Sequence, residues 1–334
     1  MLKKLLLSLL ITLSLNANAK DTVVIKSTTN RGETNIGDYW IAEDLNLAFQ
    51  ELGFNGEVDY RTEYHKQRQE EPILNIYMRG YTKFTPPFPQ GKTLLYVYYP
   101  MSYNPTSKNK TPKQKLNSRQ PMPQDSNLDD DFNNYDIIAV ASSSYAKKLN
   151  DNGIKAIYIP QYTNPKKFYP NPKDEFKHDI LFVGSNWHDR TSLRYAIESG
   201  FDVAVYGYNW QGYVPDEMYK APYIANTELN QYYSSAKIVL NDHRPDMKEK
   251  GFINNRIYDV TATGTMVISD YMPEIKEAYG DSIPMYKNKE ELKTLLNYYL
   301  NNESERKALA KKAQQITLEK FTNHAIAQQM LKAK

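Results

Sequence analysis

The second half of the chain alternates between short apolar runs and longer amphipathic runs, and this alternation constrains the fold more than any other feature. Runs of strand length occupy 179–184, 202–207, 237–241 and 265–269, and helical patterns follow at about 190–199, 226–236, 254–263 and 272–279, with further helices at 288–300, 303–319 and 322–332. Parallel strands need long crossovers such as helices, and these crossovers cover both faces of the sheet. Ligands bind such sheets at the carboxyl ends of the strands.

The first half repeats this pattern less regularly. It opens with the strand Thr22 to Lys26, a polar loop and a helix for which Asp38 is the predicted N-terminal cap and Gly53 the stop. Further strands are expected at 73–78, 93–98, 135–140 and 156–159, and a helix at 143–150. Residues 160–177 are rich in Pro and Lys, lack periodicity and are interpreted as a linker. The sequence therefore predicts an α/β protein with two Rossmann-like domains.

Two segments stand outside this pattern. Residues 103–131 are mostly Asn, Pro, Lys, Gln and Ser, which predicts a flexible insertion; its Asp129 and Asp131 are interpreted as a solvated acidic turn rather than a metal site. Residues 1–19 combine two lysines, an apolar core and the small-residue site Ala17-Asn18-Ala19, the three parts of a cleavable signal peptide. We therefore expect a periplasmic or secreted protein, or a cytoplasmic one if this interpretation is wrong. No later stretch is long or apolar enough to cross a membrane.

Composition excludes some functions. The chain has no Cys, so thiol chemistry and disulfides are ruled out. Without residues 1–19 the mature chain would carry a net charge of only +1, against the +3 of the full chain, which argues against binding to nucleic acid.

The segment from Gly251 to Asp259 has the residues of an anion-binding loop and helix. Asn254, Asn255 and Arg256 stand where the helix is expected to begin, and Asp259 follows one turn later. A helix N-terminus has free N–H groups and a partial positive charge, so it suits a diphosphate, and an acid one turn later can accept hydrogen bonds from ribose. Taken alone, the pattern also fits any α/β protein.

Four sequence blocks carry a resemblance to a known family. They are DILFVGS (179–185), VYGYNW (205–210), YYSSAKIVLNDHRPDMKEKGFINNRIYD (232–259) and FTNHAIAQQML (321–331). From about Asp179 to Leu331 the chain resembles the C-terminal domain of bacterial glycosyltransferases with the two-domain GT-B architecture, in the CgeB-like branch; residues 34–54 and 135–149 match the N-terminal domain more loosely.

The resemblance implies a domain layout. Residues 20–165 would form an acceptor-side domain, 178–320 a donor-binding domain, and 321–334 a helix that crosses back, with the ligand cleft between the domains.

One departure from the family affects the donor site. Retaining members often have two carboxylates eight residues apart; the second position is Asp259 here, but the first is Gly251. The donor site is therefore predicted to be altered or degenerate.

The predicted site residues follow from the resemblance and from their places after strands. Arg190, Arg244 and Asp259 are the predicted catalytic residues, and Gly184, Ser185, Asn254, Asn255 and Arg256 the predicted donor-binding residues. His188 and Asp189 share the loop before Arg190 and are candidate sugar contacts.

The sequence offers little for metal or base chemistry. His243 with Asp242 and Asp246 is the nearest to a metal set, but ligand spacing does not recur and no metal is predicted. An inverting mechanism would need a base from the first domain, for which Asp38, Glu33 and His65 are candidates.

The leading functional prediction is a glycosyltransferase, of the retaining kind, that needs no cofactor and transfers a sugar from a nucleotide- or lipid-linked donor to a surface glycan. The alternatives are an exported non-catalytic glycan- or nucleotide-binding protein on the same scaffold, and a periplasmic solute-binding protein. Export conflicts with a nucleotide-sugar donor, because these donors are cytoplasmic. A periplasmic donor, a lost activity or a wrong signal-peptide prediction would each remove the conflict.

Overall fold

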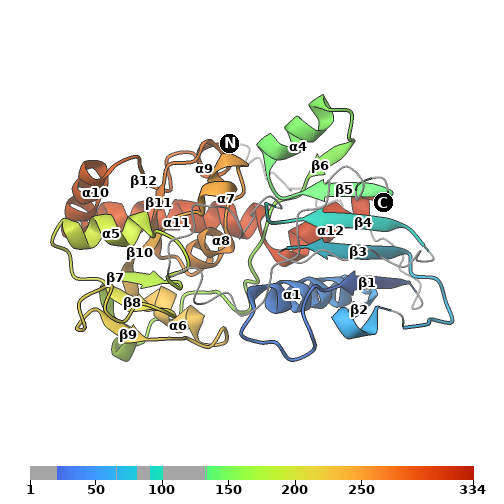
Figure 1. Ribbon diagram of the computed structural model, residues 1–334, viewed down its shortest axis with the longest axis horizontal. Coiled ribbons are helices and arrows are strands. Elements are labelled where there is room, and N and C mark those ends of the chain that lie inside the picture. The colour runs from blue at the N-terminus through green and yellow to red at the C-terminus, as the bar shows by residue number, and fades with distance from the viewer. Residues whose placement is uncertain (1–20, 65, 81–90, 101–131, 133) are drawn as a thin grey trace, which may run out of the picture.

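A computed structural model describes residues 21–64, 66–80, 91–100, 132 and 134–334. It contains two six-stranded parallel sheets, one in each half of the chain, with helices packed around them (Figure 1). The predicted α/β fold with two Rossmann-like domains is therefore confirmed. The predicted signal peptide and His65 lie outside the described residues, as does the whole predicted insertion 103–131 with its acidic pair Asp129 and Asp131. Among the described helices, none has the length and apolar character needed to span a bilayer.

The N-terminal sheet has the strand order β2-β1-β3-β4-β5-β6. Its strands are β1 (Thr22–Lys26), β2 (Asn55–Asp59), β3 (Leu74–Arg79), β4 (Thr93–Val97), β5 (Ile137–Val140) and β6 (Ala156–Tyr158). Helices α1 (Gly37–Glu51) and α4 (Ser143–Asp151) connect them, with a short 3-10 turn η1 (Arg61–Glu63) after β2. Strands β1, β3 and β4 are buried along their whole length, as expected for central strands of a parallel sheet.

Two sequence predictions for this half need correction. Strand β2 was not predicted, because its residues NGEVD offer only one strongly apolar side chain. Asp38 is not the cap of α1: the N-cap is Ile36, and Asp38 lies in the first helical turn. The Asp38 carboxylate instead accepts a hydrogen bond from the Thr28 hydroxyl, 3.1 Å away, so a tertiary contact replaces the expected local one.

The C-terminal sheet has the order β12-β11-β10-β7-β8-β9. Its strands are β7 (His178–Val183), β8 (Ala204–Tyr206), β9 (Tyr219–Ala221), β10 (Ala236–Asn241), β11 (Met266–Asp270) and β12 (Met285–Tyr286). Around it lie η2 (Asp174–Phe176), α5 (Thr191–Glu198), α6 (Leu229–Ser235), α7 (Pro245–Glu249), α8 (Asn255–Ala262), α9 (Pro273–Tyr279), α10 (Lys289–Asn301) and α11 (Glu303–Lys320). The edge strands β9 and β12 and helix α7 were not predicted, because two to five residues are too few to show a hydrophobic period.

The chain passes between the two domains twice, and the two passages pair. Thr163 on the forward passage forms a parallel bridge with Thr322 on the return. The Thr163 amide donates to the Phe321 carbonyl at 2.9 Å, and the Asn323 amide donates to the Thr163 carbonyl at 2.8 Å. Below, we call this pairing the domain crossing.

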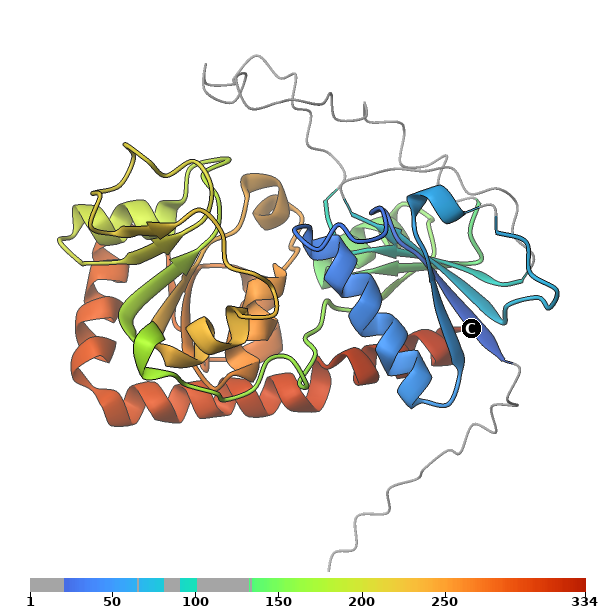
Figure 2. The same cartoon turned by 90° about the horizontal axis from the view of Figure 1, so that it is seen from below.

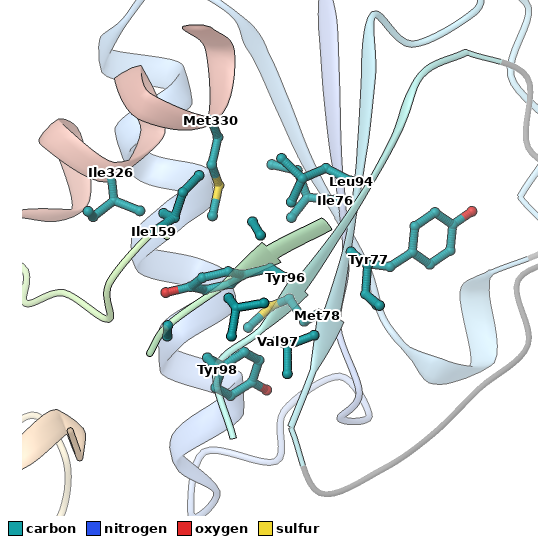
Figure 3. Packing of buried hydrophobic residues seen from close by; sticks show 14 of the residues in the cluster. Ile76, Tyr77, Met78, Leu94, Tyr96, Val97, Tyr98, Ile159, Ile326 and Met330 are labelled. Atoms are coloured by element: carbon teal, nitrogen blue, oxygen red, sulfur yellow. The ribbon is translucent and has the colours of Figure 1, made fainter. Parts of the chain in front are cut away.

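After the crossing, helix α12 (Asn323–Ala333) packs on the N-terminal domain against α1 (Figure 2). Its Ile326 and Met330 are fully buried in the same core as Ile76, Leu94 and Tyr96 (Figure 3). The last helix therefore belongs structurally to the first domain. The two domains are joined by two chain segments that are hydrogen-bonded to each other.

Candidate functional site

Two arginine side chains converge where the strand order of the C-terminal sheet reverses. After β7 the chain proceeds to β8 on one side, and β10 lies on the other, so the crevice between the ends of β7 and β10 is the switch point at which such sheets bind ligands. Arg190 comes from the loop after β7, and Arg256 from the first turn of α8. We call this pair the arginine cluster.

Each guanidinium is held by the ends of the strands. Arg190 pairs with Asp242 at 3.2 Å, and Asp242 is itself fixed by the Ser192 hydroxyl at 2.7 Å. Arg256 donates to the Asn241 side chain at 2.9 Å and to the Val183 carbonyl at 2.5 Å. These contacts place both arginines before any ligand arrives.

The Phe182 ring supports both arginines from the sheet side. The guanidinium carbon of Arg190 lies 5.8 Å from the ring centroid and that of Arg256 lies 5.5 Å from it. Both distances are within the range of cation–π attraction.

Gly184 keeps the space between the arginines open. A Cβ built on Gly184 would lie 2.9 Å from Arg256 Nη2 and 3.4 Å from Arg190 Nη2. Its own backbone is held by β8, because the Gly184 amide donates to the Tyr206 carbonyl at 2.8 Å. A side chain at position 184 would therefore enter the space beside the two guanidiniums and displace the end of Arg256.

The cluster has an excess of positive charge. Two buried or half-buried guanidiniums face one carboxylate, Asp242, and burial lowers the pKa of Arg190, an effect that Arg256 adds to and Asp242 opposes. Burial, with further contributions from Arg190 and Arg256, also lowers the pKa of His188 to about 3, so this imidazole is neutral at physiological pH. Its Nε2 is buried with no hydrogen-bond partner among the described residues. An anion with hydrogen-bonding oxygens fits such surroundings.

Of the remaining predicted donor-binding residues, Ser185 and Asn254 lie beside the cluster and Asn255 does not. The Ser185 hydroxyl accepts from the Tyr208 amide at 3.1 Å, which ties the loops after β7 and β8 together. Asn254 is the N-cap of α8, but its side chain donates to the Asp242 carbonyl at 2.9 Å instead of capping its own helix. Asn255 points away from the cluster, since its amide donates to Asp259 at 3.0 Å.

Arg244 lies beside the N-terminal domain. It pairs with Asp246 at 3.0 Å, and its guanidinium carbon is 5.2 Å from the ring centroid of Tyr99, which follows β4. Sequence reasoning missed Tyr99, although its place directly after a predicted strand was the available signal.

Asp259 is placed at the domain crossing rather than in the arginine cluster. Its carboxylate accepts from the Thr163 hydroxyl at 2.8 Å and from Asn255, and the residue is 9% exposed. Burial raises the pKa of Asp259 to about 7, with the two hydrogen bonds and Lys167 opposing the shift. The structure thus gives both carboxylate oxygens protein partners.

Gly251 has no room for the carboxylate that the family often has there. Its φ is +70°, and a Cβ would collide with the Ser144 hydroxyl and the Glu274 carboxylate. These two side chains are hydrogen-bonded to each other at 2.6 Å across the domain junction. A domain contact therefore occupies the space that an acid at 251 would need.

The candidate metal set does not assemble. His243 Nδ1 pairs with Asp270 at 2.7 Å, while Asp246 pairs with Arg244 and Asp242 with Arg190. In the part of the chain that the structure describes, no group of three His, Asp or Glu side chains is arranged to hold a metal ion.

Comparisons with known proteins agree with this geometry. A family profile described as glycosyl transferase-like matches residues 179–332, which include the whole arginine cluster. The spore protein CgeB of Bacillus subtilis (strain 168) is 27% identical over 184 residues, which cover 49% of this chain and 57% of that protein.

Solved structures share the fold over nearly the whole chain. Sucrose-phosphate synthase from Thermosynechococcus elongatus superimposes with a TM-score of 0.62 at 12% identity, over 94% of this chain and 98% of that one. Anabaena HepE, solved with UDP and glucose, has a TM-score of 0.60 at 10% identity, over 93% and 98% of the two chains.

The second half of the chain is therefore similar to a glycosyl transferase-like family and to CgeB, and the chain as a whole has the two-domain fold of GT-B glycosyltransferases. In this fold, β7 and β10 flank the switch point of the second Rossmann-like domain. The CgeB match spans little more than half of that protein, and the solved structures establish the fold.

Proposed function

We infer that this protein is a glycosyltransferase whose donor is a nucleoside diphosphate sugar bound at the arginine cluster. The observation that carries the inference is the convergence of Arg190 and Arg256 on the open space at Gly184, at the switch point of the C-terminal sheet. Guanidinium groups match phosphate oxygens in geometry and charge. HepE, which has the same fold, was solved with UDP and glucose, and this supports the choice of ligand class.

The cluster also suits the chemistry of transfer. When the bond between sugar and diphosphate breaks, negative charge develops on the leaving diphosphate. Arg190 and Arg256 are held in place by Asp242 and Asn241, so they stabilise this charge without rearranging. The His188 imidazole is neutral because burial lowers its pKa to about 3, and in its Nε2–H tautomer it would donate a further hydrogen bond to the diphosphate, since Nε2 has no partner among the described residues.

Three predictions from the sequence bear on this proposal. Export through residues 1–19 would place the protein in the periplasm or outside the cell and would call for a lipid-linked or other exported donor; fractionation with N-terminal sequencing tests this, because Lys20 as the first residue would speak against a nucleotide-sugar donor and an intact Met1 in the cytosol would fit one. Asp259 was predicted to bind the ribose, but both of its carboxylate oxygens already accept hydrogen bonds within the protein, so the donor site proposed here does not depend on it. Retention of the anomeric configuration was predicted from a pair of carboxylates, and Gly251 supplies no carboxylate to that pair; the anomer formed from a defined donor tests it.

Calorimetric titration with UDP, GDP, ADP and CDP tests donor binding. We expect one of them to bind with a dissociation constant in the micromolar to millimolar range. Arg190→Ala and Arg256→Ala should each weaken binding by about one to two orders of magnitude, because a charged hydrogen bond contributes about 1.5–3 kcal/mol.

Arg194→Ala is the matched control. Arg194 lies on helix α5, of which Arg190 is the N-cap, but Arg194 is solvent-exposed and pairs with Asp189 and Glu198. Its replacement should leave nucleotide affinity within about twofold of wild type. Wild-type protein that binds none of the four nucleotides would refute the proposed function and favour the alternative of a glycan-binding protein on this scaffold.

A further inference from the structure

A cavity of about 460 Å³ lies where the two domains meet, and its lining shares no residue with the arginine cluster. Its walls come from the end of β6 and from α12, which belong to the N-terminal domain, and from α9 and the last turn of α11, which belong to the C-terminal domain. Phe321, in the domain crossing, completes the lining. Figure 2 shows α11 and α12 end to end along one side of the molecule. We call this space the junction cavity.

Two carboxylates of α9 line the junction cavity and also bind the N-terminal domain. Glu274 accepts from the Ser144 hydroxyl at 2.6 Å, and Glu277 accepts from the Ser143 hydroxyl at 2.8 Å, both in the first turn of α4. The second carboxylate oxygen of Glu274, Oε2, is buried and has no hydrogen-bond partner among the described residues. A buried acceptor without a donor costs free energy, so a ligand that supplies the donor gains affinity there.

The charges that line the cavity are of both signs. Glu274, Glu277 and Glu319 carry negative charge, whereas Lys320 and Lys332 carry positive charge. An anionic ligand would meet three carboxylates, and a cationic ligand would meet two ammonium groups. A neutral ligand whose groups both donate and accept hydrogen bonds avoids both conflicts. Hydroxyl groups have this property, because they can donate to a carboxylate and accept from an ammonium group.

The uncharged part of the lining suits a sugar ring. Gln328 and Gln329 of α12 offer amides, which donate and accept as hydroxyl groups do. Tyr158 is 40% exposed, and with Pro160 and Phe321 it gives the apolar surface on which the C–H face of a sugar can pack. Burial, with further contributions from Glu277 and Glu274, raises the pKa of Tyr158, so its hydroxyl stays a donor at neutral pH. The volume of the cavity is in the range of small-molecule sites.

We propose that the junction cavity binds a neutral sugar unit of a glycan, at a site separate from the arginine cluster, and that the bound sugar holds the two domains together. Glu274 and Gln328 contribute to the lining from opposite domains, so a sugar that binds both bridges them. Such a ligand favours the domain arrangement in which Glu274 contacts Ser144. The proposal goes beyond the donor site and does not require it, so either proposal can fail alone.

Saturation-transfer NMR of the full-length protein with maltotriose, cellotriose, mannotriose and chitotriose tests binding. We expect at least one of them to bind with a dissociation constant in the millimolar range. Glu274→Gln still accepts from Ser144, but its amide nitrogen cannot accept from a sugar hydroxyl, so affinity should fall about tenfold or more. Gln328→Ala, at an exposed position of α12, should weaken binding about threefold or more while melting temperature stays close to wild type.

Hydrogen exchange tests the bridging of the domains. The trisaccharide that binds should slow exchange in both α4 and α9 of wild type, and it should not do so in Glu274→Gln. At about ten times its dissociation constant it should raise the melting temperature of wild type by about 2 °C or more. Binding that slows exchange in neither helix would overturn the bridging role.

Glu303→Gln is the matched control, because Glu303 is an exposed carboxylate in the first turn of α11, paired with Lys307 and far along that helix from the cavity. Its sugar affinity should stay within about twofold of wild type. The nucleotide that binds the arginine cluster should leave sugar affinity unchanged. Wild type that binds none of the four trisaccharides would overturn the proposal. Full sugar affinity in both Glu274→Gln and Gln328→Ala would overturn it as well, and displacement of the sugar by nucleotide would then assign the sugar to the donor site.

Discussion

Replacing Asp259 by Asn should remove a pH dependence of stability that originates at the domain crossing. The Asp259 carboxyl is buried between Thr163 and Asn255, and burial raises its pKa to about 7 from a reference value of 3.8. The folded state therefore binds this proton more tightly than the unfolded state. Stability from this group is full below about pH 4, falls as the pH rises from about 4 to 7, and changes little above that.

The size of the effect follows from the shift. About three pKa units at about 1.4 kcal/mol each give an upper limit of about 4 kcal/mol between pH 4 and pH 8. Asn does not titrate in this range, and its side-chain oxygen can accept from Thr163 if the Asn255 amide turns over. The Asn variant should therefore be slightly less stable than wild type at pH 4, by about 1 kcal/mol, and more stable at pH 8.

The assay is calorimetric unfolding of both proteins between pH 4 and pH 8, with nucleotide affinity measured at each pH. A gain of a few kcal/mol corresponds to a rise in melting temperature of up to about 10 °C for a domain of this size. Asp44 and Lys167 also face this carboxyl, and they are present in both proteins, so the difference between the two curves isolates Asp259. Nucleotide affinity should change less than about threefold. Parallel stability curves combined with a tenfold loss of nucleotide affinity would refute the reasoning and return Asp259 to the donor site.

Three glycine and serine substitutions extend the argument. Gly184→Ala should weaken nucleotide binding about tenfold or more with little loss of melting temperature, because its Cβ would approach only the flexible end of Arg256; equal affinity in titration would contradict the proposed geometry. Gly207→Ala should destabilise the fold by more than about 2 kcal/mol, because Gly207 has φ +143° and its Cβ would collide with the Gly184 backbone; unfolding in denaturant measures this, and a loss under about 0.5 kcal/mol would be inconsistent with it. Ser144→Ala should cost about 1–2 kcal/mol in the unfolding of the domain junction, because Glu274 loses its 2.6 Å hydrogen bond and its other oxygen is already buried without a partner among the described residues; an unchanged melting temperature would argue against this contact.

Much of the fold could be predicted from local patterns. The strand at Thr22–Lys26 was predicted with its observed bounds, and helix α8 was predicted within a residue at each end. Both predictions succeeded because buried strands and amphipathic helices have characteristic patterns of apolar residues along the sequence. Elements of two to five residues, such as β12 and α7, are too short to show a periodic pattern of apolar residues and were not predicted. Asp38 was expected as a cap because residue type and position alone suggest one, whereas its hydrogen bond comes from the Thr28 hydroxyl at the start of the loop that precedes α1.

The sequence by itself determined the two-domain α/β architecture and the presence of basic residues after β7 and at the start of α8, because strand-end positions are fixed along the chain. Only the tertiary structure decided which of these residues meet. Arg190 and Arg256 are far apart in sequence and converge on Gly184 because β7 and β10 are neighbours in the sheet. Asp259 lies only three residues after Arg256, yet it faces Thr163 on the passage between the domains. Side chains on one helix point to different surroundings, and those surroundings are set by strand order and domain packing, which no local pattern encodes.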